Sequence, residues 1–397
     1  MAIVGGGIGG LGAALALRRF GHHPVVVEQA RELRPVGAGI SLWPNGVKVL
    51  NLLGLGEAIA SIGGRMERMA YAGRDGRMLL DFPLSLLYDR VGERARPVER
   101  SALQELMLGE VGGDTVSLGV RAVAVEEAGA GVVLRTEGAG RIEADLVVAA
   151  DGTHSALREH VVGHRVERGY VGYVNWNGLV EESEDLAPIG TWLTFVGEAK
   201  RVSLMPVGRG RLYWFFDVPM PLAAASSTPG EAGDDGGGTA GGSGGVAGVL
   251  GAAFEGWAAP VRSLIERIDP TGVARIPIHA TPPLETWRRG KVVLLGDAAH
   301  TMPPDLGQGG CQALEDAWVL SHYLTSTSRG VEDALERYQA ERLPHTTAMQ
   351  QRAERRAALI HGSAPEATAG WYRSLASGSH EDIVDGLAQS VESGPCR

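Results

Sequence analysis

Residues 1–28 read MAIVGGGIGGLGAALALRRFGHHPVVVE, and this stretch decides the fold. Its pattern predicts a short apolar strand, a glycine turn, a helix and a buried β-branched strand, over Ala2–Val4, Gly5–Gly10, Leu11–Phe20 and Pro24–Glu28. Gly5, Gly7 and Gly10 stand at the G-x-G-x-x-G spacing. Such glycines permit the turn, let a pyrophosphate approach the backbone, and allow the helix to pack closely on the sheet. The stretch therefore predicts a Rossmann-like dinucleotide-binding unit.

Two later motifs indicate which dinucleotide binds. Glu28 ends the second strand, where an acid can accept hydrogen bonds from the ribose of an adenosine, but this does not separate NAD from FAD. Asp151-Gly152 and Gly296-Asp297 each follow an apolar strand. An acid at the carboxyl end of a strand can bind a polyol such as ribityl, and the glycine-rich helix start at Gly307–Gly310 can offer amide hydrogens to a flavin. Because NAD has no polyol, these residues predict an FAD-binding protein.

Composition excludes several other classes of protein. The 397 residues are 44% hydrophobic and 21% charged, which is typical of a globular protein larger than one average domain. The net charge is −10 without a basic cluster, so neither nucleic acid nor membrane is an expected partner. Cys311 and Cys396 are the only cysteines, and no run of about 18 apolar residues occurs. We therefore expect a cytoplasmic protein, and we expect no metal site because His154 and His300 lack partners at ligand spacing.

The three motifs together resemble those of a known class of enzyme. Gly5–Gly10 with Glu28, Asp151-Gly152 and Gly296-Asp297 are similar to the FAD motifs of the class A flavoprotein aromatic hydroxylases, which have the para-hydroxybenzoate hydroxylase fold. Within this class the chain most resembles the bacterial FAD-dependent urate hydroxylases, over nearly its whole length. The resemblance is also carried by GISLWPNGVKV, YVGYVNWNGLV, KRVSLMPV, RLYWFFDVP and PDLGQGGCQALEDA, which begin at Gly39, Tyr170, Lys200, Arg211 and Pro304.

The expected architecture is α/β, with two interleaved domains and a helical C-terminus. A discontinuous Rossmann-like FAD-binding domain of the GR2 type is expected over residues 1–75, 98–158 and 286–344. A mixed β-sheet domain for the substrate is expected over residues 76–97 and 159–285, and a helical segment over residues 345–397. Residues 222–248 are small, polar and rich in glycine, and they predict a flexible surface insertion in the sheet domain.

The resemblance implies a reaction and a set of site residues. NADH and O2 would be used, with bound FAD and through a flavin C4a-hydroperoxide, to hydroxylate urate at C5 and give 5-hydroxyisourate. Substrate binding is implied for Asn175 and Arg201, and catalytic roles for Arg201, Tyr213 and Asp305. FAD binding is implied for Gly5, Gly7, Gly9, Gly10, Glu28, Gln29, Ser41, Arg100, Ala122, Asp151, Asp297, Gly307, Gln308, Gly309, Gly310 and Cys311. The chain has one G-x-G-x-x-G motif between a predicted strand and a predicted helix, so NADH is expected to bind transiently.

The residue types suit this chemistry, although each side chain also has a structural interpretation. Arg201 offers a planar set of donors for an electron-rich anion, and the Asn175 amide can pair with a purine edge. Asp305 can accept a substrate proton or orient Arg201, and we favour orientation. Tyr213 can equally be sheet core, and it shares a face with Arg201 only if it pairs with an odd-numbered residue of the preceding strand.

The sequence also leaves functional alternatives open. HTMPP at His300–Pro304 and IHATPPLET at Ile278–Thr286 depart from the pattern of the urate hydroxylases, so a phenolic acid such as a hydroxybenzoate, or another electron-rich heteroaromatic, is the alternative substrate. A flavin-dependent halogenase or reductase and a non-catalytic flavin-binding sensor are the other classes considered. The oligomeric state is open, with a homodimer as one candidate, and so is the choice between NADH and NADPH.

Overall fold

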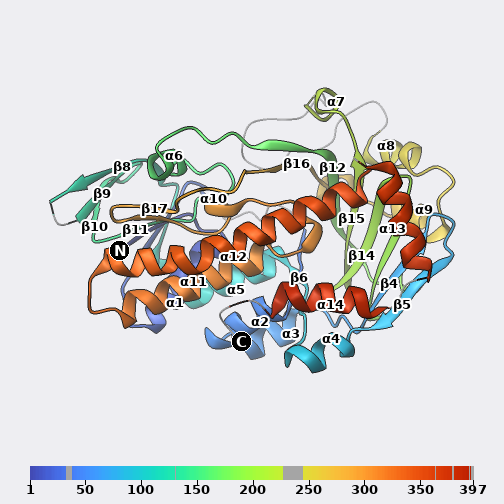
Figure 1. Ribbon diagram of the computed structural model, residues 1–397, viewed down its shortest axis with the longest axis horizontal. Helices are drawn as coiled ribbons and strands as arrows, with labels where there is room; N and C mark the ends of the chain where they lie inside the picture. Colours follow the sequence, from blue (N-terminus) through green and yellow to red (C-terminus); the bar gives the residue numbers. More distant parts are fainter. Residues whose placement is uncertain are drawn as a thin grey trace.

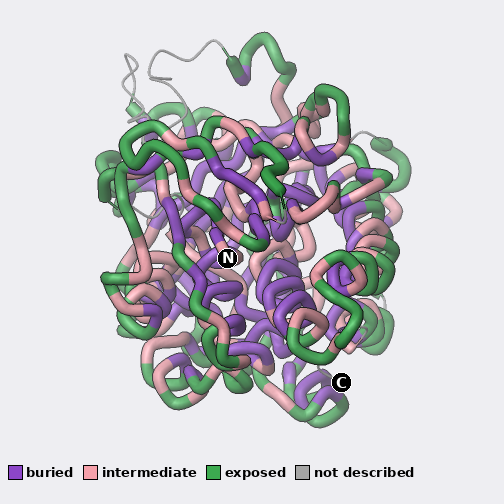
Figure 2. Tube along the Cα trace, turned by 90° about the vertical axis from the view of Figure 1, so that its left-hand side faces the viewer, coloured by how far each residue is buried: buried purple, intermediate pink, exposed green. Residues whose placement is uncertain are grey.

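Two large β-sheets organise the molecule. The computed structural model describes residues 1–32, 38–129, 131–226, 245–362, 364–377, 380–392 and Gly394. In this part of the chain a six-stranded sheet and a seven-stranded sheet lie toward opposite ends of the long axis (Figure 1). Buried segments run through the interior, whereas exposed residues gather in the connections and on the outer faces of the helices (Figure 2). The expected α/β fold with two interleaved units and a helical C-terminus is confirmed.

The six-stranded sheet is the Rossmann-like unit. Its strand order is β17-β18-β11-β1-β2-β7, over Arg288–Arg289, Val292–Leu294, Val147–Ala149, Ala2–Val4, Val25–Glu28 and Val116–Leu118. All neighbours except the β17/β18 pair run parallel, and the short strands are apolar because helices cover them. Helix α1 (Ile8–Arg19) packs between α5 (Arg100–Val111) and α11 (Gly309–Ser326). The three sequence motifs follow β1, β11 and β18, so they meet at one edge of this sheet.

The seven-stranded sheet forms the other unit. Its order is β16-β12-β15-β14-β13-β4-β5, over Ala274–Ala280, Gly169–Glu181, Arg211–Pro219, Lys200–Gly208, Thr191–Gly197, Arg68–Gly73 and Met78–Pro83. Side chains alternate between the two faces of each strand. On β14 and β15, Val202, Leu204, Trp214 and Phe216 join a core with α8 (Gly245–Ala253) and α9 (Ala259–Glu266). The odd-numbered residues between them point to the opposite face, toward the C-terminal helices.

The C-terminal helices cover that opposite face. Helix α12 (Val331–Ile360) runs along the molecule from the six-stranded to the seven-stranded sheet, and α13 (Pro365–Ser377) and α14 (His380–Val391) follow it (Figure 1). No helix in the described ranges is long and apolar enough to cross a membrane. The remaining elements are β3 (Gly39–Ile40), α2 (Pro44–Leu52), α3 (Gly56–Ile62), α4 (Ser85–Val91), β6 (Val98–Glu99), β8 (Arg121–Ala128), β9 (Gly131–Glu137), β10 (Gly140–Ala144), α6 (Arg158–Val162), α7 (Leu222–Ser226) and α10 (Asp297–His300), with 3-10 turns at Gly113–Thr115, Pro270–Gly272 and Pro304–Leu306.

The structure corrects three of the expected boundaries. Strand β4 pairs with β5 and β13 of the seven-stranded sheet, so the first FAD-domain segment ends before residue 68 and not at 75. The boundary at residue 344 falls inside the continuous helix α12. Both ends of the expected insertion are helical. Ala225 in α7 and Val246 in α8 are buried in the sheet core, so these ends belong to the folded sheet domain. Residues 227–244 of the insertion lie outside the described residues.

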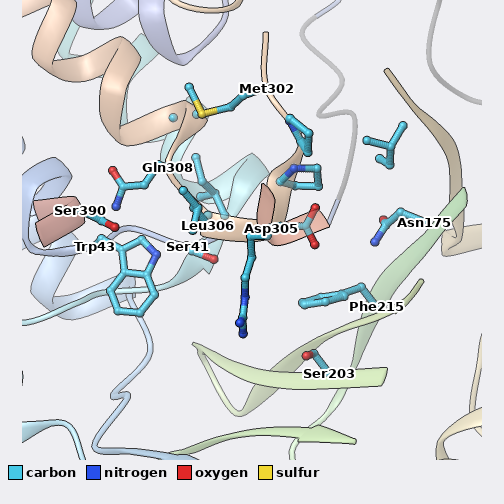
Figure 3. A pocket seen from close by; sticks show the side chains of 18 of the residues that line it. Ser41, Trp43, Asn175, Ser203, Phe215, Met302, Asp305, Leu306, Gln308 and Ser390 are labelled. Carbon is cyan, nitrogen blue, oxygen red and sulfur yellow. The ribbon is translucent and has the colours of Figure 1, made fainter. Parts of the chain in front are cut away.

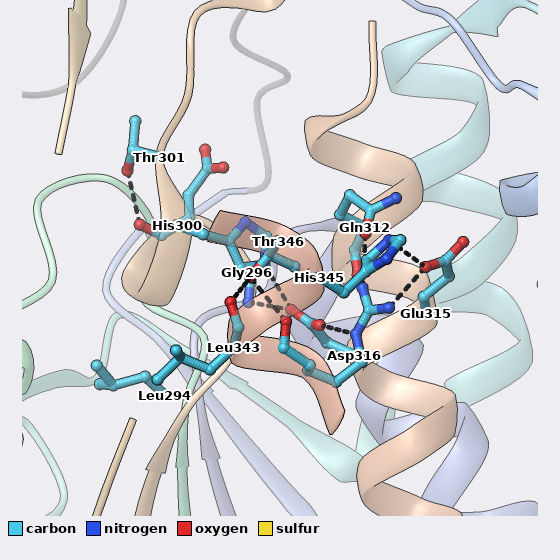
Figure 4. A network of polar contacts seen from close by, with 12 residues as sticks. Leu294, Gly296, His300, Thr301, Gln312, Glu315, Asp316, Leu343, His345 and Thr346 are labelled. Atoms are coloured by element: carbon cyan, nitrogen blue, oxygen red, sulfur yellow. Dashed lines mark hydrogen bonds and ion pairs between the residues drawn. The ribbon is translucent and has the colours of Figure 1, made fainter. Parts of the chain in front are cut away.

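A buried polar network joins α10, α11 and α12 (Figure 4). Arg342 Nε donates to Asp316 Oδ1 at 2.7 Å, and its Nη1 donates to Glu315 Oε2 at 2.8 Å. The other oxygen of Asp316 lies 2.6 Å from His300 Nε2 and accepts the backbone N–H of Gly296 at 3.0 Å. All four of these side chains are at most 1% exposed. The network therefore fixes the Gly296-Asp297 turn to the helices behind it.

This network makes stability depend on pH. Burial alone would raise the pKa of Asp316, but His300 and Arg342 lower it to about 2, whereas an unfolded aspartate titrates near ~3.9. The stabilisation is therefore present above pH ~4 and is lost as pH falls toward ~2, by about 2 kcal/mol in total. We expect the free energy of unfolding, measured in urea between pH 5 and 2.5, to fall more steeply in the native protein than in Asp316→Asn.

The comparison with the variant is needed because burial raises the pKa of Glu315, which changes stability with pH in the opposite direction. Both proteins retain Glu315 and its burial, so this largest cause of its shift cancels in the difference between their pH profiles, and what remains comes from the Asp316 charge and its smaller effect on Glu315. Parallel profiles would show that Asp316 is not the group that titrates.

Candidate active site

A single cavity of about 770 Å³ connects the two sheets. The three glycine-containing motifs and the start of α11 line one side of it, and the odd-numbered residues of β14 and β15 line another. The C-terminal helices α12, α13 and α14 supply a third wall, which the sequence did not predict. Figure 3 shows side chains from these separate segments, including Asp305, Asn175, Phe215 and Gln308, directed around the same space.

The N-terminus of α1 forms a glycine cradle that opens on the cavity. Gly7 caps the helix without any side-chain hydrogen bond, so the N–H groups of the first turn remain available. Gly7 lines the cavity and has no neighbour where a Cβ would stand, whereas a Cβ on Gly9 would lie 2.9 Å from Leu295 Cδ2. A Cβ on Gly10 would overlap the carbonyl oxygen of Gly5. These residues fit the pyrophosphate of a dinucleotide.

Gly10 leaves no room for a side chain, since a Cβ there would lie 1.9 Å from the carbonyl oxygen of Gly5. We expect Gly10→Ala to push α1 away from the β1 turn, to destabilise the protein by about 1–3 kcal/mol, and to lower the FAD content of the purified protein. The control is Gly109→Ala in α5, where a Cβ would meet nothing within 4 Å. FAD content and thermal unfolding of both variants test this, and equal FAD retention by the two would contradict the assigned close packing.

The residues expected at the adenosine end lie beside this cradle. Glu28 accepts the backbone N–H of Gly6 at 2.6 Å and that of Ala30 at 2.8 Å, which holds its carboxylate at the glycine turn. Arg100, at the start of α5, lines the cavity. Gln29 is exposed directly after β2, and Ala122 is buried in β8; neither lines the cavity, and their contacts with FAD stay predictions.

Arg158 ties the Asp151-Gly152 and Gly296-Asp297 turns together. Its guanidinium is 4% exposed and donates to the carbonyl oxygens of Gly152 at 3.3 Å and Asp297 at 2.9 Å. Asp297 lines the cavity, and its side chain has room to meet a polyol. Asp151 accepts the backbone N–H of Ala156 at 2.8 Å, and burial raises its pKa, so it holds the turn beside the cavity.

The start of α11 brings the last FAD motif to the same cavity. Gly307 has a φ of +63°, and a Cβ there would crowd Ser41 at 3.1 Å, so this turn requires glycine. Ser41 and Gly307–Gly310 line the cavity. Cys311 does not, because its thiol points back to the carbonyl oxygen of Ser41 and burial raises its pKa to about 12. Its side chain is therefore a neutral packing group.

A row of three polar side chains crosses the seven-stranded sheet at the cavity. Asn175, Asp217 and Arg201 are directly paired on the neighbouring strands β12, β15 and β14. Asp217 accepts from Asn175 Nδ2 at 2.7 Å and from Arg201 Nε at 2.7 Å, and it is completely buried. Asn175 Oδ1 also accepts from Asn177 at 2.8 Å. Asn175 therefore keeps one N–H and one lone pair for a ligand.

Asp305 holds the same arginine from the other side of the cavity. Its Oδ1 lies 3.0 Å from Arg201 Nη2 and 3.1 Å from His361 Nε2, and its Oδ2 accepts the hydroxyl of Tyr173 at 2.7 Å. Burial alone would raise the pKa of Asp305, but Arg201 and His361 hold it well below its usual value. For Arg201 burial alone would lower the pKa, and the carboxylates of Asp217 and Asp305 raise it. The cluster therefore contains an arginine cation between two carboxylates.

This arrangement leaves a defined set of donors for a ligand. Arg201 Nη1 has no partner among the described residues, since Nε and Nη2 are taken by the two carboxylates. The register pairs Tyr213 with Met205, an odd-numbered residue, so Tyr213 does share the cavity face with Arg201. Burial raises the pKa of Tyr213, so its hydroxyl is a protonated donor. Phe215 also lines the cavity, with its ring centre 5.1 Å from the Arg201 guanidinium carbon.

Three residues of this site, Asp217, Tyr173 and His361, were not predicted from the sequence. Asp217 could have been suggested by its place two residues from Phe215 on the same face of β15, but Tyr173 and His361 could not. Tyr173 and His361 are stacked, with their ring centres 3.8 Å apart, although they are 188 positions apart in the chain. No group of three or more His, Cys, Asp or Glu residues in the described ranges could hold a metal ion.

The fold, the glycine cradle and the polar row define an FAD-binding enzyme, and comparison with known proteins gives its family. The chain matches the family described as FAD binding domain over residues 1–229 and 267–353; it belongs to this family and is a flavoprotein monooxygenase.

Relatives that match over the full length of the chain are similar to it at a finer level than the family. The chain is 44% identical to the FAD-dependent urate hydroxylase of Klebsiella pneumoniae subsp. pneumoniae, with 99% of this chain and 98% of the relative covered. It is 40% identical to the FAD-dependent urate hydroxylase of Mycolicibacterium vanbaalenii, with 99% and 96% covered. The crystal structure of Klebsiella pneumoniae HpxO complexed with FAD and uric acid aligns with a TM-score of 0.92 at 43% identity, covering 100% of this chain and 97% of that chain.

Proposed function

We propose that this protein hydroxylates urate at C5, using NADH and O2 with bound FAD, and gives 5-hydroxyisourate. The balanced reaction consumes urate, NADH, O2 and one proton, and releases 5-hydroxyisourate, NAD⁺ and water. The observation that carries the proposal is a pair of donors on one face of the cavity, Arg201 Nη1 and the Tyr213 hydroxyl, for which the described residues provide no partner. The similarity to urate hydroxylases over the full chain supports the choice of substrate.

Some of these side chains bind the substrate, and others orient the guanidinium of Arg201. Arg201 and Tyr213 donate to oxygen or nitrogen acceptors of the urate anion, and Asn175 adds one donor and one acceptor. Asp217 and Asp305 keep the guanidinium plane fixed. Both oxygens of Asp305 are already engaged and its pKa is low, so it acts as an orienting group and not as the base.

FAD, when bound, supplies the transfer of electrons from NADH and the activation of O2. We propose that Gly7, Gly9 and the first turn of α1 hold its pyrophosphate, and that Asp297 and Gly307–Gly310 hold its ribityl and flavin parts. Apolar walls such as Phe215 and Met302 exclude water from the reacting centre, which favours oxygen transfer over the release of peroxide. The unusual stretch HTMPP lies in this wall, since Met302, Pro303 and Pro304 line the cavity.

The test is consumption of NADH and O2 by the purified FAD-loaded protein, with and without urate. We expect urate to stimulate both and 5-hydroxyisourate to accumulate in a 1:1 ratio to NADH. Stimulation by a hydroxybenzoate and none by urate would favour the phenolic alternative. FAD that NADH never reduces, whatever ligand is present, would reject an enzymatic function.

A further inference from the structure

One part of the cavity, called here the compartment, is lined by the C-terminal helices. Trp371 and Leu375 from α13, and Ile383 and Leu387 from α14, line it, and Trp192 of β13 lines the same cavity. These side chains come from other elements than the α1 cradle and the strands that carry Asn175 and Arg201, and the proposed function assigns no ligand to them.

Two arginines of α12 line this compartment. Arg352 and Arg356 are four residues apart, so their side chains leave the same face of the helix. Each is half-buried and held in place by an uncharged group: Arg352 Nη2 donates to the carbonyl oxygen of Gly386 at 3.0 Å, and the Arg356 guanidinium lies 4.5 Å from the ring centre of Trp371.

In the described part of the chain neither arginine forms an ion pair with an aspartate or glutamate, although Asp382 lines the same cavity. Burial, and then the neighbouring Arg355, lowers the pKa of Arg352, which is the behaviour of a cation without a counter-ion. Two like charges one helical turn apart destabilise a helix. An anion bound between Arg352 and Arg356 removes this repulsion.

The proposed reaction also needs NADH, whose pyrophosphate is an anion, and neither the FAD motifs nor the substrate donors provide a site for it. Only one G-x-G-x-x-G motif, Gly5–Gly10, follows a strand and begins a helix, and FAD takes it. The substrate donors lie on β14 and β15, on other elements of the cavity. We propose that Arg352 and Arg356 bind the pyrophosphate of the dinucleotide reductant. A diphosphate offers two charged groups to two guanidiniums, and the flat rings of Trp371 and Trp192 suit the aromatic ends of such a molecule.

This inference rests on the proposed use of NADH, and its test separates the two. In the FAD-loaded enzyme at saturating urate, Arg352→Gln and Arg356→Gln should each raise KM for NADH about tenfold, since a charged hydrogen bond contributes about 1.5–3 kcal/mol. KM for urate and the FAD content should not change. The matched control is Arg355→Gln: Arg355 is on the same helix turn, but it is exposed and does not line the cavity.

A second measurement does not depend on turnover. Isothermal titration of the FAD-loaded protein with ADP should show binding that the double variant Arg352→Gln/Arg356→Gln loses and Arg355→Gln keeps. A rise in KM for urate instead of NADH, an equal effect of Arg355→Gln, or no binding of ADP to the native protein would overturn this site. Binding of ADP at these arginines without any urate-stimulated NADH oxidation would instead reject the proposed function and leave the diphosphate site standing.

Discussion

Replacing Arg201 with glutamine is expected to lower the rate of urate hydroxylation by about 10²–10³-fold, the usual cost of losing one preorganised charged donor at a reacting centre. Arg201 Nη1 is the one guanidinium nitrogen without a partner among the described residues, and Arg201 lines the cavity. FAD content should be retained, because Arg201 contacts none of the glycine motifs. NADH oxidation should continue in part and yield hydrogen peroxide, measured against 5-hydroxyisourate in the same sample.

The variant also leaves two buried carboxylates without their cation, so a loss of stability must be separated from a loss of catalysis. In Arg201→Gln/Asp217→Asn one of those charges is removed, and we expect this double variant to regain thermal stability without regaining hydroxylation. Lys200→Gln is the neighbouring control, because Lys200 Nζ points away from the cavity to the carbonyl oxygen of Ala253. Full coupling in Arg201→Gln, or rescue of activity by the second substitution, would show that Arg201 serves the fold alone.

The sequence predicted those parts of the site in which neighbouring residues carry the signal. Gly5, Gly7 and Gly10 follow a strand at a fixed spacing, and the backbone geometry that this spacing demands is local. The alternation of β14 and β15 is also local, so Arg201 and Tyr213 could be placed on one face once their register was specified. The register itself depends on the turn and on packing across the sheet, and only the structure supplies it.

What the sequence could not predict depends on contacts between distant segments. Asp305 and His361 meet because α12 passes over the turn that precedes α11, and no periodicity in either segment indicates this contact. The third wall of the cavity has the same origin, since α13 and α14 have the apolar spacing of any surface helix. Two expected domain boundaries differ from the structure for the same reason. Strand β4 pairs within the seven-stranded sheet, and α12 continues as one helix past residue 344, and both facts depend on packing that the local sequence does not encode.

Arg342→Met is expected to produce the largest loss of stability, about 3–5 kcal/mol, because it removes the cation from two buried carboxylates. Arg342 is 1% exposed and donates to Asp316, Glu315 and the side-chain oxygen of Gln312. Chemical denaturation of the FAD-free protein gives the difference in free energy. The same helix provides the control: Arg337→Met removes an exposed ion pair with Asp333, which is worth about 0–1 kcal/mol.

The same substitution should also weaken FAD binding, and this effect distinguishes an orienting network from a merely packed one. Asp316 holds the backbone N–H of Gly296 with the oxygen that also faces His300, so loss of Arg342 frees this carboxylate to move and loosens the turn that carries Asp297. Adding Glu315→Gln to Arg342→Met removes one of the two buried charges that lost Arg342 and should recover stability, but it does not restore the hydrogen bond from Arg342 to Asp316. FAD affinity should therefore stay low in the double variant while its unfolding free energy rises. If affinity and stability recover together, the network stabilises the helices without positioning the FAD motif.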